Sequence, residues 1–426
     1  MKILNTDQQK ISFILQQLRR VRSKSEDTES VVKKILTDVR EDGDRALRNY
    51  TFKFDGYSSL KFRLTDAEIK AAYQKIDAKL LKALKQAKTN IEKFHKSQLR
   101  KKEKIIETMK GVQVWREFRA IEKVGLYVPG GKAAYPSTVL MLAVPAYVAG
   151  CREIILCTPA DRLGRCNPAV LVAADLCGIK NIFKIGGAQA IAAMAYGTAS
   201  IPKVSKIFGP GNQYVTTAKM MVYGEVDIDM PAGPSEVMVI ADDSANPQFI
   251  AADLLSQLEH GEDSQAVLLS FSSAFALKVI RIMKEQMKKL SRQSIIEKSL
   301  KRSFAVVVSS VQEACVIANE YAPEHLEIVV RHESQILKKI LNAGSVFLGP
   351  YSSEPLGDYA TGANHTLPTS GFAKMFSPLS TESFGKMLQY QRVSAQGIKN
   401  LKRTVEVLAD AEGLDAHKNA VTIRFY

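Results

Sequence analysis

The stretch Val124-Gly125-Leu126-Tyr127-Val128-Pro129-Gly130-Gly131 decides the fold, because a short apolar run ends there in a glycine-rich turn. Apolar runs of this kind recur along the chain in two series, separated by turns and helical stretches. Strands that alternate with helices predict parallel sheets covered by helices, and two series predict two such domains. The expected strands are 124–128, 153–157, 182–185 and 206–208 in the first series, and 237–240, 266–270, 304–308, 326–330 and 346–348 in the second.

Two further glycine-rich turns follow strands of the first series, at 185–189 and 208–212. Each can bring backbone amides close to a phosphate. None is the GxGxxG dinucleotide fingerprint, since Tyr214 stands where the third glycine belongs. Alone, each fits a tight turn. Together they indicate a ligand site, because open α/β sheets bind ligands beyond the ends of their strands.

The segments on either side of the strands have a different pattern. Residues up to about Ala120 are expected to be helical, and Thr65 with Glu68 predicts a capping box at the start of a long basic helix. The tail from about Leu379 is polar and expected to be mostly helical.

Composition favours a globular protein with more than one domain. The chain has 426 residues, of which 46% are hydrophobic and 24% charged. The start, 1–13, lacks the apolar block of a signal peptide. The longest apolar stretch, 139–151, contains Pro145 and is too short for a bilayer. We therefore expect a cytoplasmic protein with no membrane partner.

Cysteine usage and charge exclude two other classes. The five cysteines form no CxxC pair, which argues against a disulfide framework or a thiolate zinc site, and Cys151 and Cys157 fit buried thiols better than nucleophiles. The net charge of +15 invites a nucleic-acid interpretation. Much of the excess lies opposite the apolar stripe of the basic helix, however, and no nucleic-acid module accompanies it. A nucleic-acid-binding role depends on charge alone, so we expect no such partner.

The histidines carry the chemical signal. Four of the six lie in polar clusters, whereas His95 and His332 look like surface residues. An imidazole beside a carboxylate or carboxamide supplies both proton-transfer groups and metal ligands. The pattern favours a metal-assisted enzyme. The clusters are Gln257 to His260, Glu324-His325, Asp358 to His365, and Glu412 to His417.

The sequence leaves alternatives open for each cluster. Gln257 and His260 fall at the end of an expected helix, 246–261, where a buried polar pair is an equally good interpretation. Pro323 puts Glu324-His325 on a turn, where the pair can handle two different protons or simply face solvent. The glycine-rich loop 355–368 suits the lining of a site.

Two weaker candidates complete the set. Ser235 places a hydroxyl at the entrance of a strand, and His417 lies near the C-terminus, where a lone histidine is usually a surface residue. From the residues alone, the chain is an α/β enzyme with an oxygen/nitrogen metal site and an acid–base pair. A zinc hydrolase is a rival interpretation, because a carboxylate beside a metal-bound water is also hydrolytic chemistry.

Taken together, the motifs resemble the histidinol dehydrogenase family. The likeness runs from about Val31 to the C-terminus through GLYVPGG, YPSTVLM, GGAQAIAA, KIFGPGNQYV, DMPAGPSEV, LLSQLEHG, YAPEHLE, GDYATGANHTLPT and EGLDAHKNA. Leu142 departs from the family pattern, in which many members have Asn, and we expect only a packing change. The resemblance implies two Rossmann-like parallel-sheet α/β/α domains of aldehyde-dehydrogenase type. It assigns 1–24 to an N-terminal arm, 25–122 and 236–378 to a catalytic domain, 123–235 to an NAD-binding domain, and 379–426 to a dimerisation tail.

The resemblance also implies an activity and a site. The family oxidises L-histidinol to L-histidine through the aldehyde with zinc and two NAD+, as intertwined homodimers whose tails reach the partner. By matching motifs, Glu324 and His325 would be catalytic. The implied zinc ligands, which also contact substrate, are Gln257, His260, Asp358 and His417; the further substrate contacts are Ser235, His325, His365 and Glu412; and the NAD contacts are Tyr127, Gln189 and Asn212.

Overall fold

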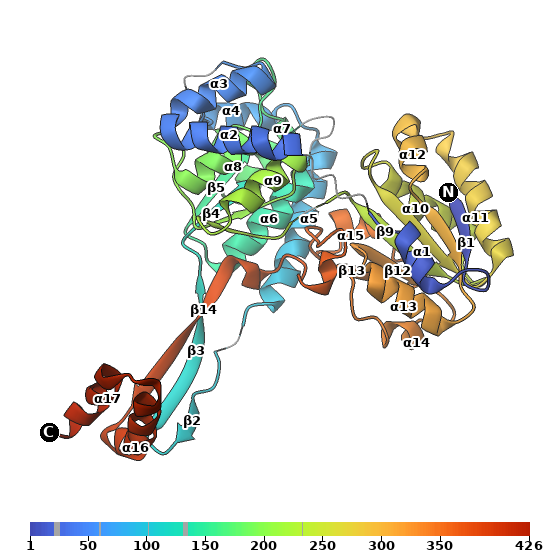
Figure 1. The fold of residues 1–426 in the computed structure, drawn as a ribbon. Coiled ribbons are helices and arrows are strands. Elements are labelled where there is room, and N and C mark those ends of the chain that lie inside the picture. Colours follow the sequence, from blue (N-terminus) through green and yellow to red (C-terminus); the bar gives the residue numbers. More distant parts are fainter. Residues whose placement is uncertain (21–25, 59–60, 101, 131–134, 232) are drawn as a thin grey trace.

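The computed structural model describes residues 1–20, 26–58, 61–100, 102–130, 135–231 and 233–426. Within them lie two parallel sheets and one antiparallel sheet (Figure 1). Gly131 and Ala232, which belong to two of the motifs above, lie outside the described residues, as does the expected end of the N-terminal arm at 21–25.

The first parallel sheet contains the four strands predicted in the first series. The strand order is β6-β5-β4-β7-β8, and every neighbouring pair is parallel. The chain starts at β4, adds two strands on one side and two on the other, so the order reverses between β4 and β7. The strands are β4 (Lys123–Tyr127), β5 (Glu153–Thr158), β6 (Asn181–Lys184), β7 (Lys206–Phe208) and the unpredicted β8 (Asp227–Ile228).

Helices cover both faces of this sheet because its strands are apolar on both sides. Leu126 and Leu156 pack in one core, and Tyr127 and Ile155 in the other. Leu142 is fully buried in the first core. Among the described residues, no helix is long and apolar enough to cross a membrane. The connecting helices are α6 (Pro136–Ala149), α7 (Pro168–Leu176), α8 (Gly187–Tyr196) and α9 (Gln213–Val222).

The N-terminal helices also pack on this sheet. Val32 and Leu47 share the core of Ile155, and Leu84 and Ile91 share the core of Leu126. This packing differs from the expected grouping of 25–122 with 236–378. The capping box of Thr65 and Glu68 is confirmed, but it opens only the first of two helices. These helices are α2 (Glu26–Asp42), α3 (Asp44–Asp55), α4 (Asp66–Tyr73) and α5 (Ala78–Ser97).

The second parallel sheet contains the five strands predicted in the second series, in the order β1-β11-β10-β9-β12-β13. Its edge strand β1 comes from the arm that we expected to be helical, and it pairs in parallel with β11. The strands are β1 (Lys2–Asn5), β9 (Glu236–Ala241), β10 (Gln265–Ser270), β11 (Phe304–Val307), β12 (His325–Val329) and β13 (Ser345–Leu348).

This sheet is also covered on both faces. One face carries α10 (Pro247–Leu258), α11 (Ser273–Met287) and α12 (Gln293–Leu300). The other carries α1 (Ile11–Gln17), α13 (Val311–Tyr321) and α14 (Glu333–Leu337). The fold class is therefore the predicted one, with two parallel α/β/α units.

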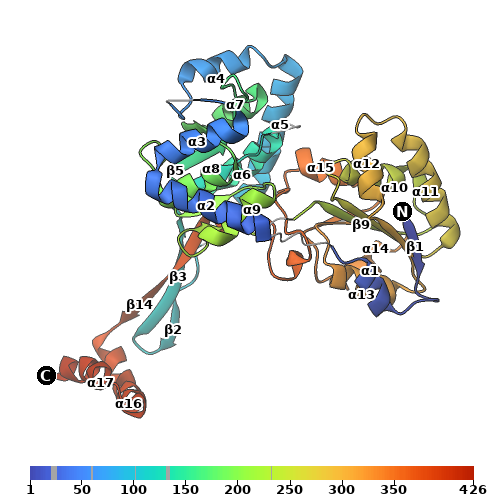
Figure 2. The same ribbon diagram turned by 45° about the horizontal axis from the view of Figure 1, so that its top comes forward.

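A protruding arm combines strands that were not predicted with two helices of the tail that was expected to be mostly helical. It contains β2 (Ile106–Met109), β3 (Val112–Ala120) and β14 (Gly385–Val393), followed by α16 (Ala395–Glu412) and α17 (Asp415–Thr422). β14 pairs antiparallel with β3 along nine residues, so the expected helix through 106–120 is wrong. Figures 1 and 2 show this arm extending away from both parallel sheets.

The cysteines behave as small apolar residues. All five are free and buried. Burial raises the pKa of Cys151 to about 12 and that of Cys157 further still. Because the thiolate is the reactive form, these values agree with the structural role expected from the sequence.

Candidate active site

A cavity lies where the strands of the five-stranded sheet end. It has a volume of about 1000 Å³ and is lined by residues that follow β4, β5 and β6 and by the start of α9. Its position, at the carboxyl edge beside the reversal of strand order, is the usual ligand position in open α/β sheets. Tyr127, Gln189 and Asn212 all line it, so the three predicted cofactor contacts come together.

The three side chains differ in how they are held. The Tyr127 hydroxyl accepts a hydrogen bond of 3.0 Å from the Gly187 amide. Asn212 caps α9, and its side-chain oxygen accepts from the Tyr214 and Val215 amides at 3.1 Å. Gln189 is 1% exposed, yet neither its amide oxygen nor its amide nitrogen has a hydrogen-bond partner. A buried carboxamide without partners is costly, so its two polar atoms are available to a ligand.

The turn that leads into α9 is braced by a buried ion pair. Lys219 contacts Asp229 and donates to the Gly209 carbonyl at 2.9 Å, while Asp229 accepts from the Gly209 amide at 2.7 Å. Gly209 has a φ of +123°, and a Cβ there would lie 2.1 Å from the Tyr127 carbonyl oxygen. The sequence therefore needs glycine at this turn, which places Asn212 beside Tyr127.

The acid–base pair lies in the other unit, at the amino edge of the six-stranded sheet. Glu324 is 6% exposed and His325, the first residue of β12, is 3% exposed, so the surface alternative for this pair is wrong. Glu324 and Glu236 are joined twice across neighbouring strands. The Glu236 amide donates to the Glu324 carboxylate at 2.9 Å, and the Glu324 amide donates to the Glu236 carboxylate at 3.2 Å.

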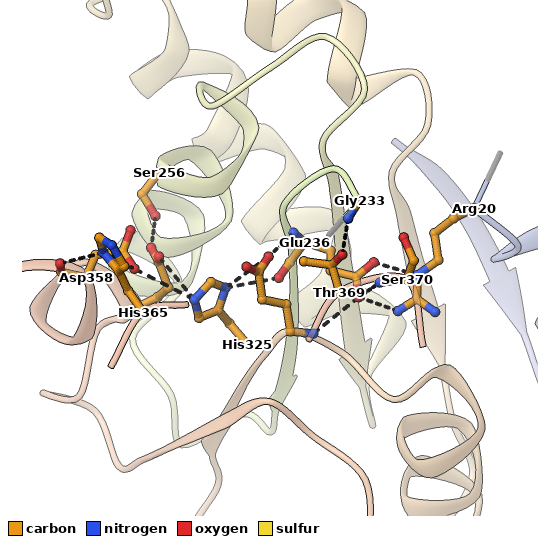
Figure 3. A network of polar contacts seen from close by, with 11 residues as sticks. Arg20, Gly233, Glu236, Ser256, His325, Asp358, His365, Thr369 and Ser370 are labelled. Carbon is orange, nitrogen blue, oxygen red and sulfur yellow. Dashed lines mark hydrogen bonds and ion pairs between the residues drawn. The ribbon is translucent and has the colours of Figure 1, made fainter. Parts of the chain in front are cut away.

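His325 is held as a neutral imidazole with one free nitrogen. Its Nδ1 lies 3.2 Å from the Glu236 carbonyl, which can only accept, so Nδ1 carries the proton and Nε2 has the lone pair. Nε2 faces Glu354 at 3.7 Å and Asp358 at 3.8 Å. Burial lowers the pKa of His325 to about 4. Figure 3 shows the ring between Glu236 on one side and Asp358 on the other.

Burial and neighbouring carboxylates raise the pKa of Glu324, whereas burial lowers that of His325. Burial raises the pKa of Glu324 well above the ordinary value, and Glu236, Asp358 and Glu354 add to the effect. A raised pKa makes the ionised carboxylate a stronger proton acceptor. The pair thus combines a neutral imidazole with a basic carboxyl group.

Arg20 of the N-terminal arm anchors this arrangement. Its guanidinium forms a two-pronged ion pair with Glu236, at 2.5 Å from Nε and 2.6 Å from Nη2. The guanidinium also stacks on the Tyr321 ring at 3.5 Å from the centroid. Because Glu236 positions Glu324 and His325, the N-terminal arm contributes to the site through the contact of Arg20 with Glu236. The sequence offered no signal for it.

A group of potential metal ligands lies next to the pair. One ligand atom each from His260, Glu354 and Asp358 lie within 4.8 Å of one another. Gln257 is completely buried in the last turn of α10, and neither of its amide atoms has a hydrogen-bond partner. His260 lies just beyond the helix, which ends at Leu258, and is exposed. These donors suit a divalent cation such as zinc.

Glu354 is the member that sequence reasoning missed. It begins α15 (Glu354–Tyr359), four residues before Asp358, so the two carboxylates share one helix face. Ser256 donates to Glu354 Oε2 at 3.2 Å, and Glu354 also has a side-chain hydrogen bond with Asp358. Burial and Asp358 raise the pKa of Glu354 to about 9. The spacing from Asp358 was the available signal.

His365 and Ser235 also lie at this edge. His365 Nδ1 donates to the Asp358 carbonyl at 3.0 Å (Figure 3). Its Nε2 lies 3.3 Å from the Thr138 hydroxyl. Burial lowers the pKa of His365. Ser235 directly precedes β9 and is half-buried.

His95 was wrongly interpreted as a surface residue. It is completely buried, and its Nε2 faces the Asn364 amide nitrogen at 3.3 Å. Asn364 also donates to the Met141 carbonyl at 2.6 Å. His95 therefore supports the loop that carries His365.

The tail candidates lie elsewhere in the single chain. Glu412 ends α16 and His417 lies in α17, and both side chains are exposed. Figures 1 and 2 place α17 at the far end of the arm, away from α15 and β12. One chain thus brings together His260, Asp358, Glu324, His325 and His365, but not Glu412 or His417.

Comparison with known proteins agrees with this geometry. The family model for histidinol dehydrogenase matches residues 18–425. The chain is 51% identical to a histidinol dehydrogenase of Bacteroides fragilis over 408 residues, which cover 96% of this chain and 95% of the relative. It is 48% identical to a histidinol dehydrogenase of Methanocaldococcus jannaschii over 407 residues, with the same coverage.

A solved structure extends the match to the fold. The crystal structure of histidinol dehydrogenase from Elizabethkingia anophelis superposes with a TM-score of 0.96 at 47% sequence identity, covering 100% of this chain and 98% of the other. Sequence motifs, family model and fold agree over nearly the whole length. The chain belongs to the histidinol dehydrogenase family.

Proposed function

We propose that the protein catalyses the zinc- and NAD-dependent four-electron oxidation of L-histidinol to L-histidine through L-histidinaldehyde, the last step of histidine biosynthesis. Family membership supports the substrate and the direction. The observation that carries the proposal is the buried Glu324–His325 pair beside the group of His260, Glu354 and Asp358. We further propose that the enzyme works in the cytoplasm.

The donor set fits a zinc ion. Gln257, His260 and Asp358 would hold it, with His417 as a further ligand from the tail. The orphaned amide of Gln257 supports this assignment, because a cation would give its buried oxygen a partner. A bound zinc ion would supply a Lewis acid that holds the substrate and keeps the reacting carbon in place.

The cavity of the five-stranded unit fits a dinucleotide. Tyr127, Gln189 and Asn212 would contact NAD, and the N-terminus of α9 suits its phosphates. The volume of about 1000 Å³ is large enough for a ligand of this size. When bound, NAD+ accepts hydride; the protein positions the reactants and moves protons.

The first oxidation needs a base for the hydroxyl proton. His325 suits this role because Nδ1 is committed to the Glu236 carbonyl and Nε2 is left with a lone pair. Its neutral state follows from the lowered pKa. The imidazole can then pass the proton to the neighbouring carboxylate of Glu354, which lies 3.7 Å from Nε2.

The second oxidation needs water, because the aldehyde must gain an oxygen before it can become an acid. Glu324 suits the task of taking a proton from that water. Its raised pKa makes it a good acceptor, and the Glu236 amide fixes one of its oxygens. Glu324 and His325 thus divide the two proton transfers.

The site is proposed to be shared within a homodimer. The protruding arm ends in helices that, in a lone chain, expose several apolar side chains, including Val407, Leu408 and Ile423. Contiguous exposed apolar surface marks an interface. A second copy covering this arm would also bring Glu412 and His417 to a site, as the family resemblance implies.

The proposal is tested by histidinol-dependent reduction of NAD, followed by absorbance before and after metal removal. We expect activity to disappear on chelation and to return with added zinc, in step with metal content measured by elemental analysis. A hydrolase would release product without reducing NAD. Full NAD reduction by metal-free protein would contradict the zinc assignment.

Gln189→Leu should separate cofactor binding from stability. The substitution removes two buried polar atoms that have no partners, so the unfolding temperature should not fall. The dissociation constant for NAD should rise roughly tenfold, the value of one or two hydrogen bonds. Zinc content should not change.

Gln265→Leu is the matched control. Gln265 is also buried, but its amide accepts from the Tyr321 hydroxyl and donates to the Arg302 carbonyl, both at 2.7 Å. This variant should lose stability and keep its NAD affinity. Equal NAD affinities for Gln189→Leu and the parent protein would place the cofactor elsewhere.

A further inference from the structure

The cavity of the five-stranded unit contains a second polar side chain without a partner, the carboxylate of Asp55. Asp55 is the last residue of α3 and lines the cavity. Its Oδ2 atom is shielded from solvent and has no hydrogen-bond partner. Burial raises the pKa of Asp55 to about 6, which still leaves the group ionised at neutral pH. A carboxylate only accepts hydrogen bonds, so this oxygen needs a donor.

The basic side chains that line the cavity do not satisfy Asp55. Arg165 is paired with Asp161 at 2.8 Å. Lys75 forms no ion pair with Asp55 in the described part of the chain. The remaining source of a donor for Asp55 Oδ2 is a ligand in the cavity.

Asp161 is the acidic residue that best matches the usual dinucleotide pattern, in which a carboxylate after the first glycine-rich turn binds a ribose hydroxyl. It follows β5, the strand that comes after that turn, and it lines the cavity. Its oxygens are already committed, however. Oδ1 accepts from the Leu163 and Arg165 amides, and Oδ2 from Arg165 Nε, all at 2.9 Å. Among the described lining residues, Asp55 is the other carboxylate.

The direction of the cofactor follows from the place of the reacting groups. In the proposed mechanism, NAD presents its nicotinamide to His325, which lies in the six-stranded unit. Figures 1 and 2 show α9, whose N-terminus suits the phosphates, nearer than α3 to the six-stranded sheet. The end of the cofactor beside α3 is therefore the adenosine. Ile35 and Phe54, which also line the cavity, offer apolar surface to its base.

We propose that Asp55 binds the hydroxyl groups of the adenosine ribose and thereby makes the site selective for NAD over its 2′-phosphorylated form, NADP. This rests on the proposed function, which supplies the dinucleotide. The two oxygens of one carboxylate can accept from the two neighbouring hydroxyls of a ribose. The same carboxylate repels a phosphate at the 2′ position, because both groups carry negative charge.

The test measures the binding of NAD and of NADP to the full-length protein by titration calorimetry, without histidinol. Asp55→Asn should weaken NAD binding roughly tenfold, because a charge-assisted hydrogen bond is lost. NADP binding should stay the same or improve, so the preference for NAD should fall by roughly tenfold or more. The unfolding temperature should not fall, because the substitution removes a shielded charge that has no partner in the free protein.

Asp161→Asn is the matched control. Asp161 lines the same cavity, but its carboxylate is held by Arg165 and by two backbone amides. Because the exposed ion pair contributes little, the affinity of this variant for NAD should stay within about twofold of the parent value.

A second measurement locates the contact on the adenosine ribose. ADP-ribose lacks the nicotinamide, and its 2′-deoxyadenosine analogue also lacks the hydroxyl in question. Loss of this hydroxyl should weaken binding to the parent protein and have little effect on binding to Asp55→Ala, because the two changes remove the same contact.

The assignment is wrong if Asp55→Asn keeps the NAD affinity of the parent protein, or if Asp161→Asn loses as much NAD affinity. It is also wrong if the parent protein binds NADP as tightly as NAD, or if the 2′-hydroxyl contributes equally in the parent protein and in Asp55→Ala. A parent protein that binds neither NAD nor ADP-ribose would instead contradict the dinucleotide site itself. If Gln189→Leu weakens NAD binding while Asp55→Asn does not, only the role of Asp55 is wrong.

Discussion

Glu324→Gln should slow the oxidation of histidinaldehyde by about a thousandfold while leaving the oxidation of histidinol within a few fold of the parent rate. The aldehyde must add water before it can be oxidised, and a carboxamide cannot take the proton from that water. In the proposed mechanism the alcohol step uses His325, whose Nδ1 is held by the backbone of Glu236 rather than by Glu324. The glutamine oxygen can still accept from the Glu236 amide, so the fold should be retained.

The two half-reactions are measured separately in single-turnover experiments, starting from the alcohol or from the aldehyde. The alcohol step of the same variant is the internal control, and an unchanged unfolding temperature excludes a global defect. A parallel loss in both steps would refute the division of labour between Glu324 and His325.

His417→Ala should reduce turnover and weaken zinc binding by about a hundredfold, because loss of a ligand costs at least as much as loss of a residue that supports one. In one chain His417 lies in α17, away from α10 and α15 (Figure 1). The effect therefore depends on a second copy. His332→Ala, at another exposed histidine, should change neither property.

Mixed dimers identify which subunit supplies the residue. In a hybrid dimer of His417→Ala and Glu324→Gln, one of the two sites combines Glu324 from one subunit with His417 from the other. That site is therefore complete. After random exchange of two inactive variants, about a quarter of the parent activity should return, since half the dimers are hybrids and each has one whole site. If no activity returned, His417 would act in the site of its own subunit.

The sequence predicted the elements that have a strong local pattern. All nine expected strands are present, because each is an apolar run between turns, and all but the edge strand β13 are largely buried in a parallel sheet. The three glycine-rich turns come together at one cavity, which Gly130, Gly187 and Asn212 line, and its role as a ligand site stays a prediction. The fold class follows from these features.

Features that depend on distant partners were not predictable in this way. The ribbon β3–β14 is mostly half-buried or exposed, so it lacks the apolar pattern of a core strand, and its pairing joins segments more than 260 residues apart. Helices α2–α5 have an apolar face, but the pattern does not say which sheet receives it. Glu354 and Arg20 are single polar residues whose partners only the fold brings near.

The ribbon of β3 and β14 constrains the order in which the chain folds during synthesis. β3 has to wait for β14, which leaves the ribosome only after more than 260 further residues have been made. Both parallel units can form before that moment, whereas the ribbon cannot. A truncated product that stops before Gly385 would carry an unsatisfied strand edge, the kind of surface on which nascent chains aggregate.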